Sequence, residues 1–250
     1  MLKIDTLYDA LLDAVAPRAE AELEALRVGP FWSLVVTTVG AGLASSLRSE
    51  AHIHGSKPIT DAGKLHRRTP LELARLLRSE SIPETAIGLA AVNALLGPPE
   101  GALTEHNAKE ILAERGAGKR VAMIGHFPFA DGLRTRCSEL WVFERGDGRR
   151  DDDHGAEMMD ELLPQAEVVA ITSTTIINRT LPEILGRVRP DAFVLMLGPS
   201  TPLTPLVFRL GIDVACGTVI TDAGQVLKAV EQGAVTRQIG GVRKVCLWPE

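Results

Sequence analysis

The sequence predicts an α/β protein with a Rossmann-like, mostly parallel sheet in its C-terminal half and a smaller α+β part before it. From about Asn107 onward, short apolar segments alternate with helical segments, as in a parallel sheet with crossover helices. The apolar segments do not alternate with polar residues, which indicates strands buried on both faces. Before this region the order of elements is different. The glycine- and proline-rich segment 97–101 separates the two patterns, so we expect domains at residues 1–100 and 107–250.

The N-terminal part is expected to begin with a helix and a hairpin. Between residues 5 and 26, apolar side chains recur at helical spacing, which predicts a helix or a pair of helices divided at Pro17. Residues 32–47 contain two β-prone runs on either side of Gly40 and Gly42. This pattern predicts a hairpin with a glycine turn.

Two helices are expected after the hairpin, each marked by a start signal. Thr69 is followed three residues later by Glu72, and Ser81 by Glu84. This spacing is that of a capping box, in which two side chains satisfy free backbone N–H groups at a helix start. The N-terminal part is therefore expected to be α+β.

The C-terminal half is expected to contain six strands and five helices. The strands are predicted at residues 120–125, 139–144, 166–171, 191–197, 212–216 and 242–247. The helices are predicted at residues 107–115, 155–163, 180–188, 203–210 and 222–232. Right-handed crossovers would place the loops after the parallel strands along one edge of the sheet, where ligands bind in such folds.

The charge and hydropathy of the chain argue against nucleic acid and membranes as partners. The chain has 250 residues, 45% hydrophobic and 24% charged, with a net charge of -5 and acids and bases interleaved. No basic stripe predicts nucleic-acid binding, and no apolar run reaches the roughly 18 residues of a membrane span. The N-terminus lacks a signal-peptide pattern, so we expect a cytoplasmic protein. The three cysteines, Cys137, Cys216 and Cys246, lack CxxC spacing and are expected to be buried thiols.

The loop after the first strand of the C-terminal half is the first candidate site. Gly125 would let a ligand approach the backbone, with His126 and Phe127 beside it. Glu144 ends the next strand about 20 residues later, the offset at which an acid in dinucleotide-binding folds meets a ribose hydroxyl. The loop lacks the GxGxxG motif, and the alternative is a turn glycine with a solvated glutamate.

Polar residues also follow the third strand. Thr172, Thr174 and Asn178 offer hydroxyl and amide groups that can orient a carboxylate, phosphate or carbonyl. Thr180, three residues before Glu183, is expected to cap the next helix instead.

The fourth strand leads into a proline-rich loop. Because prolines there fix the backbone, the N–H groups of Gly198, Ser200 and Thr201 could form a preorganised anion pocket. The alternative is a stiff connection into the next helix.

Two residues are candidate metal ligands. His126 could bind a metal or act as a general acid or base, with loop hydrogen bonding as the alternative. Cys216 ends the fifth strand and could be a thiolate ligand, with a buried thiol as the alternative. Residues 151–154, three aspartates and a histidine, are expected to be a solvated charge run.

These motifs together resemble a family of uncharacterised prokaryotic proteins labelled as "putative heavy-metal chelation" proteins. The resemblance covers nearly the whole chain and rests on segments 88–96, 121–129, 162–185 and 195–218 and on a late turn at residues 231–234. It implies an enolase-N-terminal-like α+β domain, a Rossmann-like domain, and an active site at their interface. It also implies a role in handling metals or metal-bearing cofactors.

The resemblance carries a set of motif positions onto this chain: Gly125, Phe127, Glu144, Thr172, Thr174, Asn178, Thr180, Gly198, Pro199, Ser200 and Pro202. The chain departs from the pattern at His126, where the family is expected to vary, and at Arg179, where a glycine is expected.

Three functional hypotheses follow. In the first, the protein binds a small anionic or chelating ligand between its domains and serves in heavy-metal chelation or metallocofactor handling, with a divalent metal as partner. In the second, it is an enzyme that uses S-adenosylmethionine or a nucleotide, held by Glu144. A third, a non-catalytic sensor or subunit, follows from the lack of a nucleophile–base pair. A homodimer is expected, as for many cytosolic proteins of this size.

Overall fold

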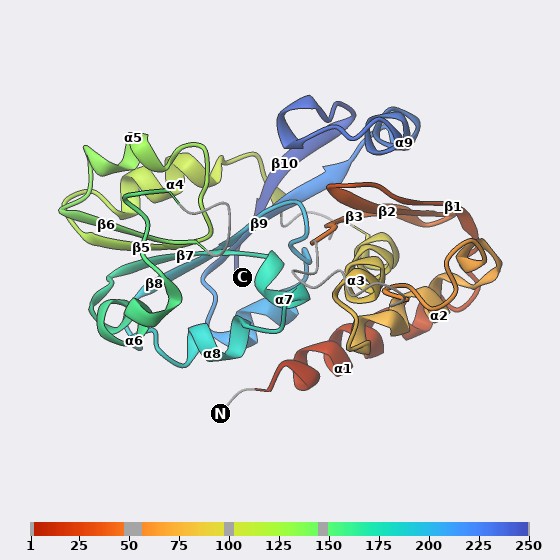
Figure 1. The fold of residues 1–250 in the computed structure, drawn as a ribbon, viewed down its shortest axis with the longest axis horizontal. Coiled ribbons are helices and arrows are strands. Elements are labelled where there is room, and N and C mark those ends of the chain that lie inside the picture. The colour runs from red at the N-terminus through yellow and green to blue at the C-terminus, as the bar shows by residue number, and fades with distance from the viewer. Residues whose placement is uncertain (1–2, 48–56, 98–102, 145–149, 250) are drawn as a thin grey trace.

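The computed structural model describes residues 3–47, 57–97, 103–144 and 150–249, which form two sheets with helices around them (Figure 1). The smaller sheet contains three antiparallel strands in the order β1-β2-β3. The larger contains seven strands in the order β4-β10-β9-β8-β7-β5-β6. The five strands from β9 to β6 are parallel to one another, while β10 pairs antiparallel with both of its neighbours, β9 and β4. The predicted fold class, a mostly parallel sheet with a smaller α+β part before it, is confirmed.

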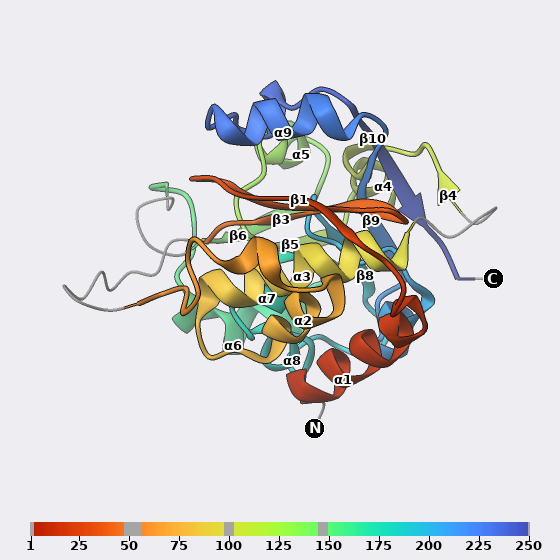
Figure 2. The same cartoon turned by 90° about the vertical axis from the view of Figure 1, so that its right-hand side faces the viewer.

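The N-terminal part supplies the small sheet and three α-helices. Its elements are, in order, α1 (Ile4–Val15), β1 (Leu23–Val28), β2 (Trp32–Thr37), β3 (Gly40–Ser45), α2 (Pro70–Ala74) and α3 (Ile82–Leu96). In the second view the small sheet lies between α3 on one face and α9 on the other (Figure 2). Apolar side chains of β2 pack against Val226 and Val230 of α9, which is why β2 is buried along its whole length.

The C-terminal half contains the large sheet. Its elements are, in order, β4 (Leu103–Thr104), α4 (Ala108–Arg115), β5 (Arg120–Ile124), α5 (Ala130–Arg134), β6 (Glu139–Phe143), α6 (Met159–Leu162), β7 (Val168–Thr172), α7 (Thr174–Ile177), α8 (Leu181–Leu185), β8 (Phe193–Leu197), β9 (Val214–Ile220), α9 (Ala223–Glu231) and β10 (Val242–Leu247). All six predicted strands are present. Pro205–Leu210, predicted as a helix, forms a 3₁₀ helix.

Three predictions in the N-terminal part are wrong. The residues from Leu23 to Val28 form strand β1, because their backbone pairs with β2. Gly40 and Gly42 lie inside β3, not in the hairpin turn. The Thr69–Glu72 capping box is present, but Ser81 does not cap α3, because its hydroxyl donates to the Pro58 carbonyl.

The strand order places a topological switch point between β5 and β7. The chain passes from β5 to β6 on one side and returns to β7 on the other. In open parallel sheets, ligands bind outside the carboxyl ends of the strands at such a point. No helix among the described residues is long and apolar enough to cross a membrane.

Candidate functional site

Gly125 follows β5 directly and brings two strand ends together. Its φ of +94° lies in the region that favours glycine, and its N–H donates to the Phe143 carbonyl at 2.8 Å. A Cβ at this position would lie 3.1 Å from the Thr172 side-chain methyl at the end of β7. The predicted residues after β5 and β7 are therefore in contact, and the contact leaves little room for any side chain on Gly125.

Glu144 holds the same loop. Its carboxylate accepts a hydrogen bond from the His126 backbone N–H at 2.7 Å. The alternative of a solvated strand terminus is therefore wrong for Glu144. The carboxylate stabilises the turn after β5 through this hydrogen bond.

His126 forms a buried pair with Asp153. The His126 Nδ1 lies 2.9 Å and 3.1 Å from the two Asp153 carboxylate oxygens, and the two side chains are 8% and 0% exposed. Asp153 also accepts from the Arg150 N–H at 3.0 Å. The prediction of a solvated charge run is therefore wrong for Asp153. The His126 Nε2 is buried and has no hydrogen-bond partner among the described residues.

The polar residues after β7 mainly hydrogen-bond to one another. The hydroxyl oxygens of Thr172 and Thr174 lie 3.1 Å apart. The Asn178 side-chain oxygen accepts from the Thr180 hydroxyl at 2.7 Å and from its N–H at 3.3 Å. Thr180 stands at the N-cap position of α8 but makes no capping bond, so the predicted capping role is wrong. Asn178 therefore has a structural role that the sequence did not indicate, because its side chain holds Thr180 at the start of α8.

The loop after β8 does not present the predicted row of free N–H groups. The Gly198 N–H donates to the Cys216 carbonyl at 3.1 Å, and the Thr201 N–H donates to the Gly198 carbonyl at 3.1 Å. The Ser200 hydroxyl oxygen accepts from the Ser45 N–H of β3 at 2.8 Å. Two of the three predicted donors are thus already used, and Ser200 links the two sheets.

A cavity of about 330 Å³ lies beside Phe127, Gly198 and Cys216. Of the ten predicted ligand-binding residues, it reaches only Phe127 and Gly198; the predicted metal ligand Cys216 also borders it. The other lining residues are His106, Asn107, Ala108, Pro128, Phe129, Leu197, Pro199, Gly217, Thr218, Thr236, Arg237, Lys244, Val245 and Cys246.

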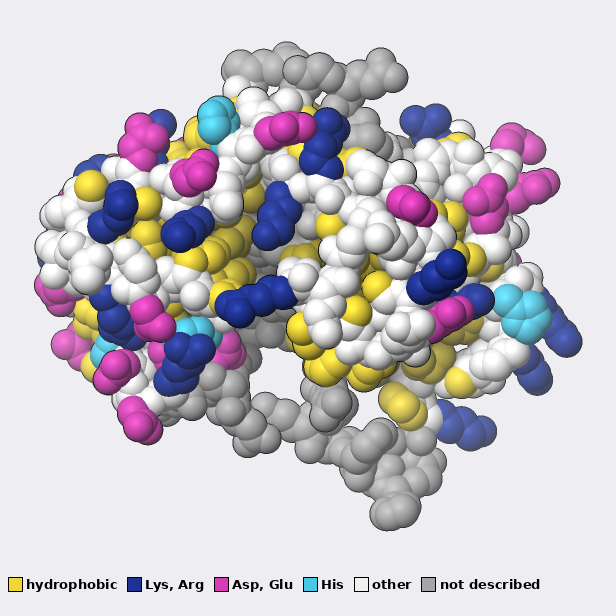
Figure 3. All heavy atoms as spheres, turned by 90° about the horizontal axis from the view of Figure 1, so that it is seen from above, with side chains coloured by type: hydrophobic (Ala, Val, Ile, Leu, Met, Phe, Trp, Pro, Cys, Tyr) yellow, Lys and Arg dark blue, Asp and Glu magenta, His cyan; other side chains and the backbone are white. Residues whose placement is uncertain are grey.

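One wall of the cavity is aromatic and its rim is cationic. The rings of Phe127 and Phe129 stack with centroids 5.6 Å apart and an angle of 18° between their planes. Arg237 and Lys244 are exposed, and no ion pair within the described part of the chain includes either. In the space-filling view, hydrophobic side chains lie in a hollow with several lysine and arginine side chains around it (Figure 3).

The sequence did not single out His106, Arg237 or Lys244. Arg237 and Lys244 come from the segment after α9, which carries no motif. The available signal was the position of Lys244 two residues before Cys246 in a predicted strand, since residues two apart face the same side. A cation beside a cysteine on one strand face can be read from sequence alone.

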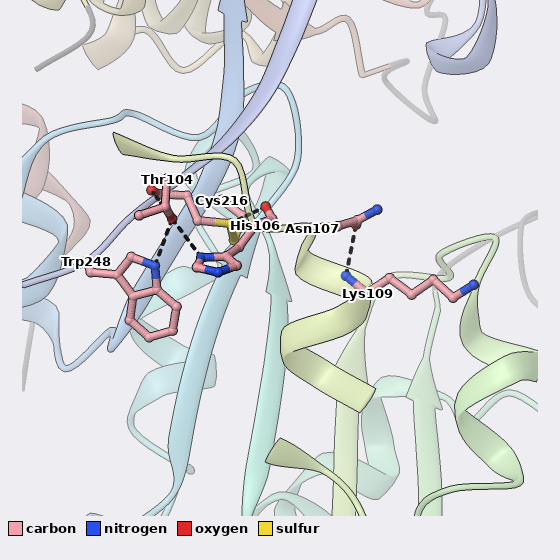
Figure 4. Close-up of a disulfide and its surroundings, with 7 residues drawn as sticks. Thr104, His106, Asn107, Lys109, Cys216 and Trp248 are labelled. Atoms are coloured by element: carbon pink, nitrogen blue, oxygen red, sulfur yellow. Dashed lines mark hydrogen bonds between the residues drawn. A yellow bond between two sulfur atoms is a disulfide. The ribbon is translucent and has the colours of Figure 1, made fainter. Parts of the chain in front are cut away.

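Cys216 and Cys246 form a disulfide between β9 and β10 (Figure 4). They are register partners, and their Cα atoms lie 4.0 Å apart. The prediction of buried thiols is wrong for these two residues, and in this oxidised form Cys216 has no thiolate to offer a metal. The odd cysteine count hid the pair, because Cys137 is the free cysteine.

Neither predicted metal ligand, His126 or Cys216, lies in a cluster of three or more ligating side chains among the described residues. Among the described residues, no group of three or more His, Cys, Asp or Glu side chains is placed to hold a metal ion. His126 therefore has the buried carboxylate partner that is typical of a metal-binding histidine, without further protein ligands beside it.

Family models match both parts of the chain. The model of the DUF364 family, described as "putative heavy-metal chelation", matches residues 107–248, and that of DUF4213, with the same description, matches residues 8–96. The chain belongs to the DUF364 family. The resemblance noted from the sequence motifs is thereby confirmed.

Members of the DUF364 family with solved structures share the fold. One from Desulfitobacterium hafniense DCB-2, of unknown function, is 22% identical with a TM-score of 0.81 and 98% of each chain covered. Another from Pyrococcus horikoshii, also of unknown function, is 19% identical with a TM-score of 0.84, covering 98% of this chain and 99% of that one. An uncharacterised protein of Methanocaldococcus jannaschii is 27% identical over 191 residues, which is 74% of this chain and 72% of that protein.

Proposed function

We propose that this DUF364 protein binds a small anionic organic ligand, of the kind that can itself chelate a metal ion, in the cavity beside Phe127, Arg237 and Lys244. The observation that carries the proposal is the combination in one cavity of a stacked aromatic wall with two cations that have no acidic partner among the described residues. The lining residues all lie between residues 106 and 246, so the proposed site belongs to the C-terminal half instead of the interface expected from the family resemblance.

The size and lining of the cavity suit a small organic molecule. Its volume of about 330 Å³ is at the lower end of the 300 to 1,000 Å³ typical of small-molecule sites. Such sites combine mostly apolar walls with a few polar groups that orient the ligand. Phe127 and Phe129 offer a flat apolar surface on which a planar ligand can lie.

The charges favour an anion. Arg237 and Lys244 both border the cavity, and the first residue of helix α4 lines it as well. The N-terminus of a helix carries partial positive charge, which adds to the attraction of the two side chains. A carboxylate entering the cavity would be the first acidic partner of either cation among the described residues.

For a metal ion that needs three or more ligands, handling through a bound chelator fits these residues better than chelation by protein side chains alone. The described residues offer no cluster of three ligands, whereas the cavity can hold an organic anion that brings its own carboxylates. The alternative of a nucleotide or S-adenosylmethionine held by Glu144 draws no support from the geometry, because that carboxylate accepts from the His126 N–H and does not border the cavity.

Calorimetric titration with pyridine-2,6-dicarboxylate, a planar dianionic chelator, tests the proposal with and without Zn²⁺. We expect binding that weakens at high salt, as for any ligand attracted by exposed charges. Lys244→Ala and Arg237→Ala should each raise the Kd about tenfold, which corresponds to about 1.4 kcal/mol. Arg243→Ala is the matched control, because Arg243 neighbours Lys244 in β10 but pairs with Glu105 at 3.2 Å.

Titrations with S-adenosylmethionine and adenine nucleotides separate the two hypotheses. Binding of one of these compounds that is lost in Glu144→Ala would favour the cofactor-using enzyme. A dicarboxylate Kd that is unchanged in both Lys244→Ala and Arg237→Ala would rule out the proposed cavity.

A further inference from the structure

Cys216 and Cys246 both border the same cavity. The two residues face each other across the antiparallel pair of β9 and β10, in a register that runs from Val242–Ile220 to Leu247–Ala215. Their Cα atoms lie 4.0 Å apart (Figure 4). Because the backbone pairing of the two strands holds the cysteines opposite each other, the sulfurs stay neighbours whether or not they are bonded.

A cation shares this face of the two strands. Lys244 and Thr218 are register partners two residues away from the cysteine pair, so all four side chains lie on one side of the sheet. All four residues border the cavity. A nearby ammonium favours the thiolate form of a cysteine, which is the form that binds metals.

The reduced form also has a hydrogen-bond partner in place. The Cys246 sulfur lies 3.2 Å from the backbone carbonyl oxygen of His106. This is within reach for donation by a thiol, whereas the sulfur of a disulfide has no hydrogen to donate. The surroundings therefore accept a Cys246 thiol without any rearrangement of His106.

We propose that Cys216 and Cys246, once reduced, form a two-thiolate site for one thiophilic metal ion of the Cu⁺ or Hg²⁺ class, and that the disulfide abolishes this site. Soft metal ions prefer thiolate ligands, and a linear site needs only two of them. The pair therefore provides protein ligands even though the described residues contain no group of three. The site shares the cavity of the proposed function but does not depend on anion binding there.

The Cys216–Cys246 disulfide is reduced by thiol–disulfide exchange. Two molecules of a small thiol, or one dithiol, give two electrons and two protons to the Cys216–Cys246 disulfide and become a disulfide themselves. Metal binding then forms two metal–sulfur bonds and releases the two thiol protons. In a reducing compartment such as the cytosol, the pair is expected in its metal-binding form.

Thiol counting and Cu⁺ titration of the full chain test the proposal. Because the chain has three cysteines, a thiol reagent in denaturant should find one thiol after diamide oxidation and three after reduction. Under anaerobic conditions the reduced protein should take one Cu⁺ from a chromogenic competitor, and the oxidised protein none. Cys216→Ser and Cys246→Ser should each weaken Cu⁺ binding at least about 100-fold, since one of two thiolates is lost.

Cys137→Ser is the matched control and should bind Cu⁺ as the wild type does, because Cys137 is half-buried outside the cavity. A second readout needs no variant: bound Cu⁺ should protect Cys216 and Cys246, but not Cys137, from alkylation as read by mass spectrometry. Three free thiols after diamide, or Cu⁺ binding that follows Cys137, would overturn the proposal. Arg237→Ala should weaken dicarboxylate binding about tenfold and leave Cu⁺ binding unchanged, because Arg237 borders the cavity but lies outside the two strands that carry the cysteines, so the two proposals can fail separately.

Discussion

Tyr8, in helix α1, reports on the packing of the N-terminal part against helix α7 of the C-terminal half. It is the one tyrosine of the chain, it is fully buried, and its hydroxyl donates to the Ile176 carbonyl at 2.5 Å. Burial raises the pKa of Tyr8 to about 12, although the nearby Arg179 guanidinium lowers it in part. The phenol therefore stays neutral in the folded protein at a pH where it would ionise in the unfolded chain.

We predict that folded Tyr8 ionises near pH 12, against 10.0 for a free tyrosine. Because the folded pKa is the higher one, its stabilising effect is complete below pH 10 and is lost as the pH rises through about 12. The absorbance of phenolate followed against pH measures this titration directly, since no second tyrosine contributes. Tyr8→Phe should lose the part of the alkaline dependence of Tm that comes from the phenol, and ionisation near pH 10 in the native protein would show that the contact with Ile176 is absent.

Arg179 shows what a resemblance can and cannot predict. The family pattern led us to expect glycine there, and the structure gives a reason, because the φ of Arg179 is +64°. A left-handed backbone costs a non-glycine residue roughly 1 to 2 kcal/mol. In this chain the arginine offsets that cost by donating to the Arg78 and Ser79 carbonyls at 3.0 and 2.9 Å. The pattern identified a special position, but the compensating contacts come from a segment 100 residues earlier.

The candidate site could be predicted only where strand order decides it. Gly125 and Thr172 follow neighbouring parallel strands, so the rule that ligands bind at strand ends was enough to bring them together. The pairing of His126 with Asp153 could not be predicted, because it depends on how the segment around His154 pairs with the end of β6. The Cys216–Cys246 disulfide required the register of an antiparallel strand that was expected only as part of a mostly parallel sheet.

At the scale of elements, tertiary contacts determine the secondary structure of segments whose hydrophobic periodicity alone is misleading. Leu23 and Leu26 continue the helical spacing of α1, yet they lie in β1 because β2 offers an antiparallel partner to them. Strands β5, β7 and β8 were predicted closely, because a short and continuous apolar run is typical of a parallel strand that is buried on both faces. The short helices α5 and α7 carry too few residues to show a period.

The contact between α3 and β3 leads to a prediction about glycine. A Cβ on Gly42 would overlap the Ala90 carbonyl oxygen and the Ala94 amide nitrogen, both in the backbone of α3. Backbone atoms cannot move aside as a flexible side chain can, so Gly42→Ala should destabilise the protein by about 3 kcal/mol, the upper end of overpacking costs. Urea denaturation followed by circular dichroism measures the change.

Gly132→Ala is the matched control for this prediction. Gly132 lies in helix α5, and a Cβ there would meet no atom within 4 Å. Alanine has the higher helix propensity, so this variant should be unchanged or up to about 1 kcal/mol more stable. Equal stability of the two variants would mean that α3 and β3 are not in close contact.

At the scale of the whole molecule, the two parts recognised by sequence share one core. Leu7 and Leu11 of α1 belong to the same hydrophobic cluster as Ile176 and Leu181 after β7. Helix α9, from the end of the chain, covers the small N-terminal sheet (Figure 2). Sequence patterns divide the chain near residue 100, but they carry no information on which surfaces pack together afterwards. We therefore propose that residues 1–100 and 107–250 fold as one unit.

This proposal predicts a single cooperative unfolding transition for the full chain. Urea curves from circular dichroism and from tryptophan fluorescence should coincide, with Trp32 reporting on the small sheet and Trp141 and Trp248 on the C-terminal half. A fragment of residues 107–250 would expose the face of α9 that now packs on Trp32 and Leu34, so it should lack the near-ultraviolet circular dichroism of fixed tertiary structure. Two separate transitions, or a fragment with native-like near-ultraviolet signals, would instead mean that the cavity and its cysteine pair belong to an independent C-terminal domain.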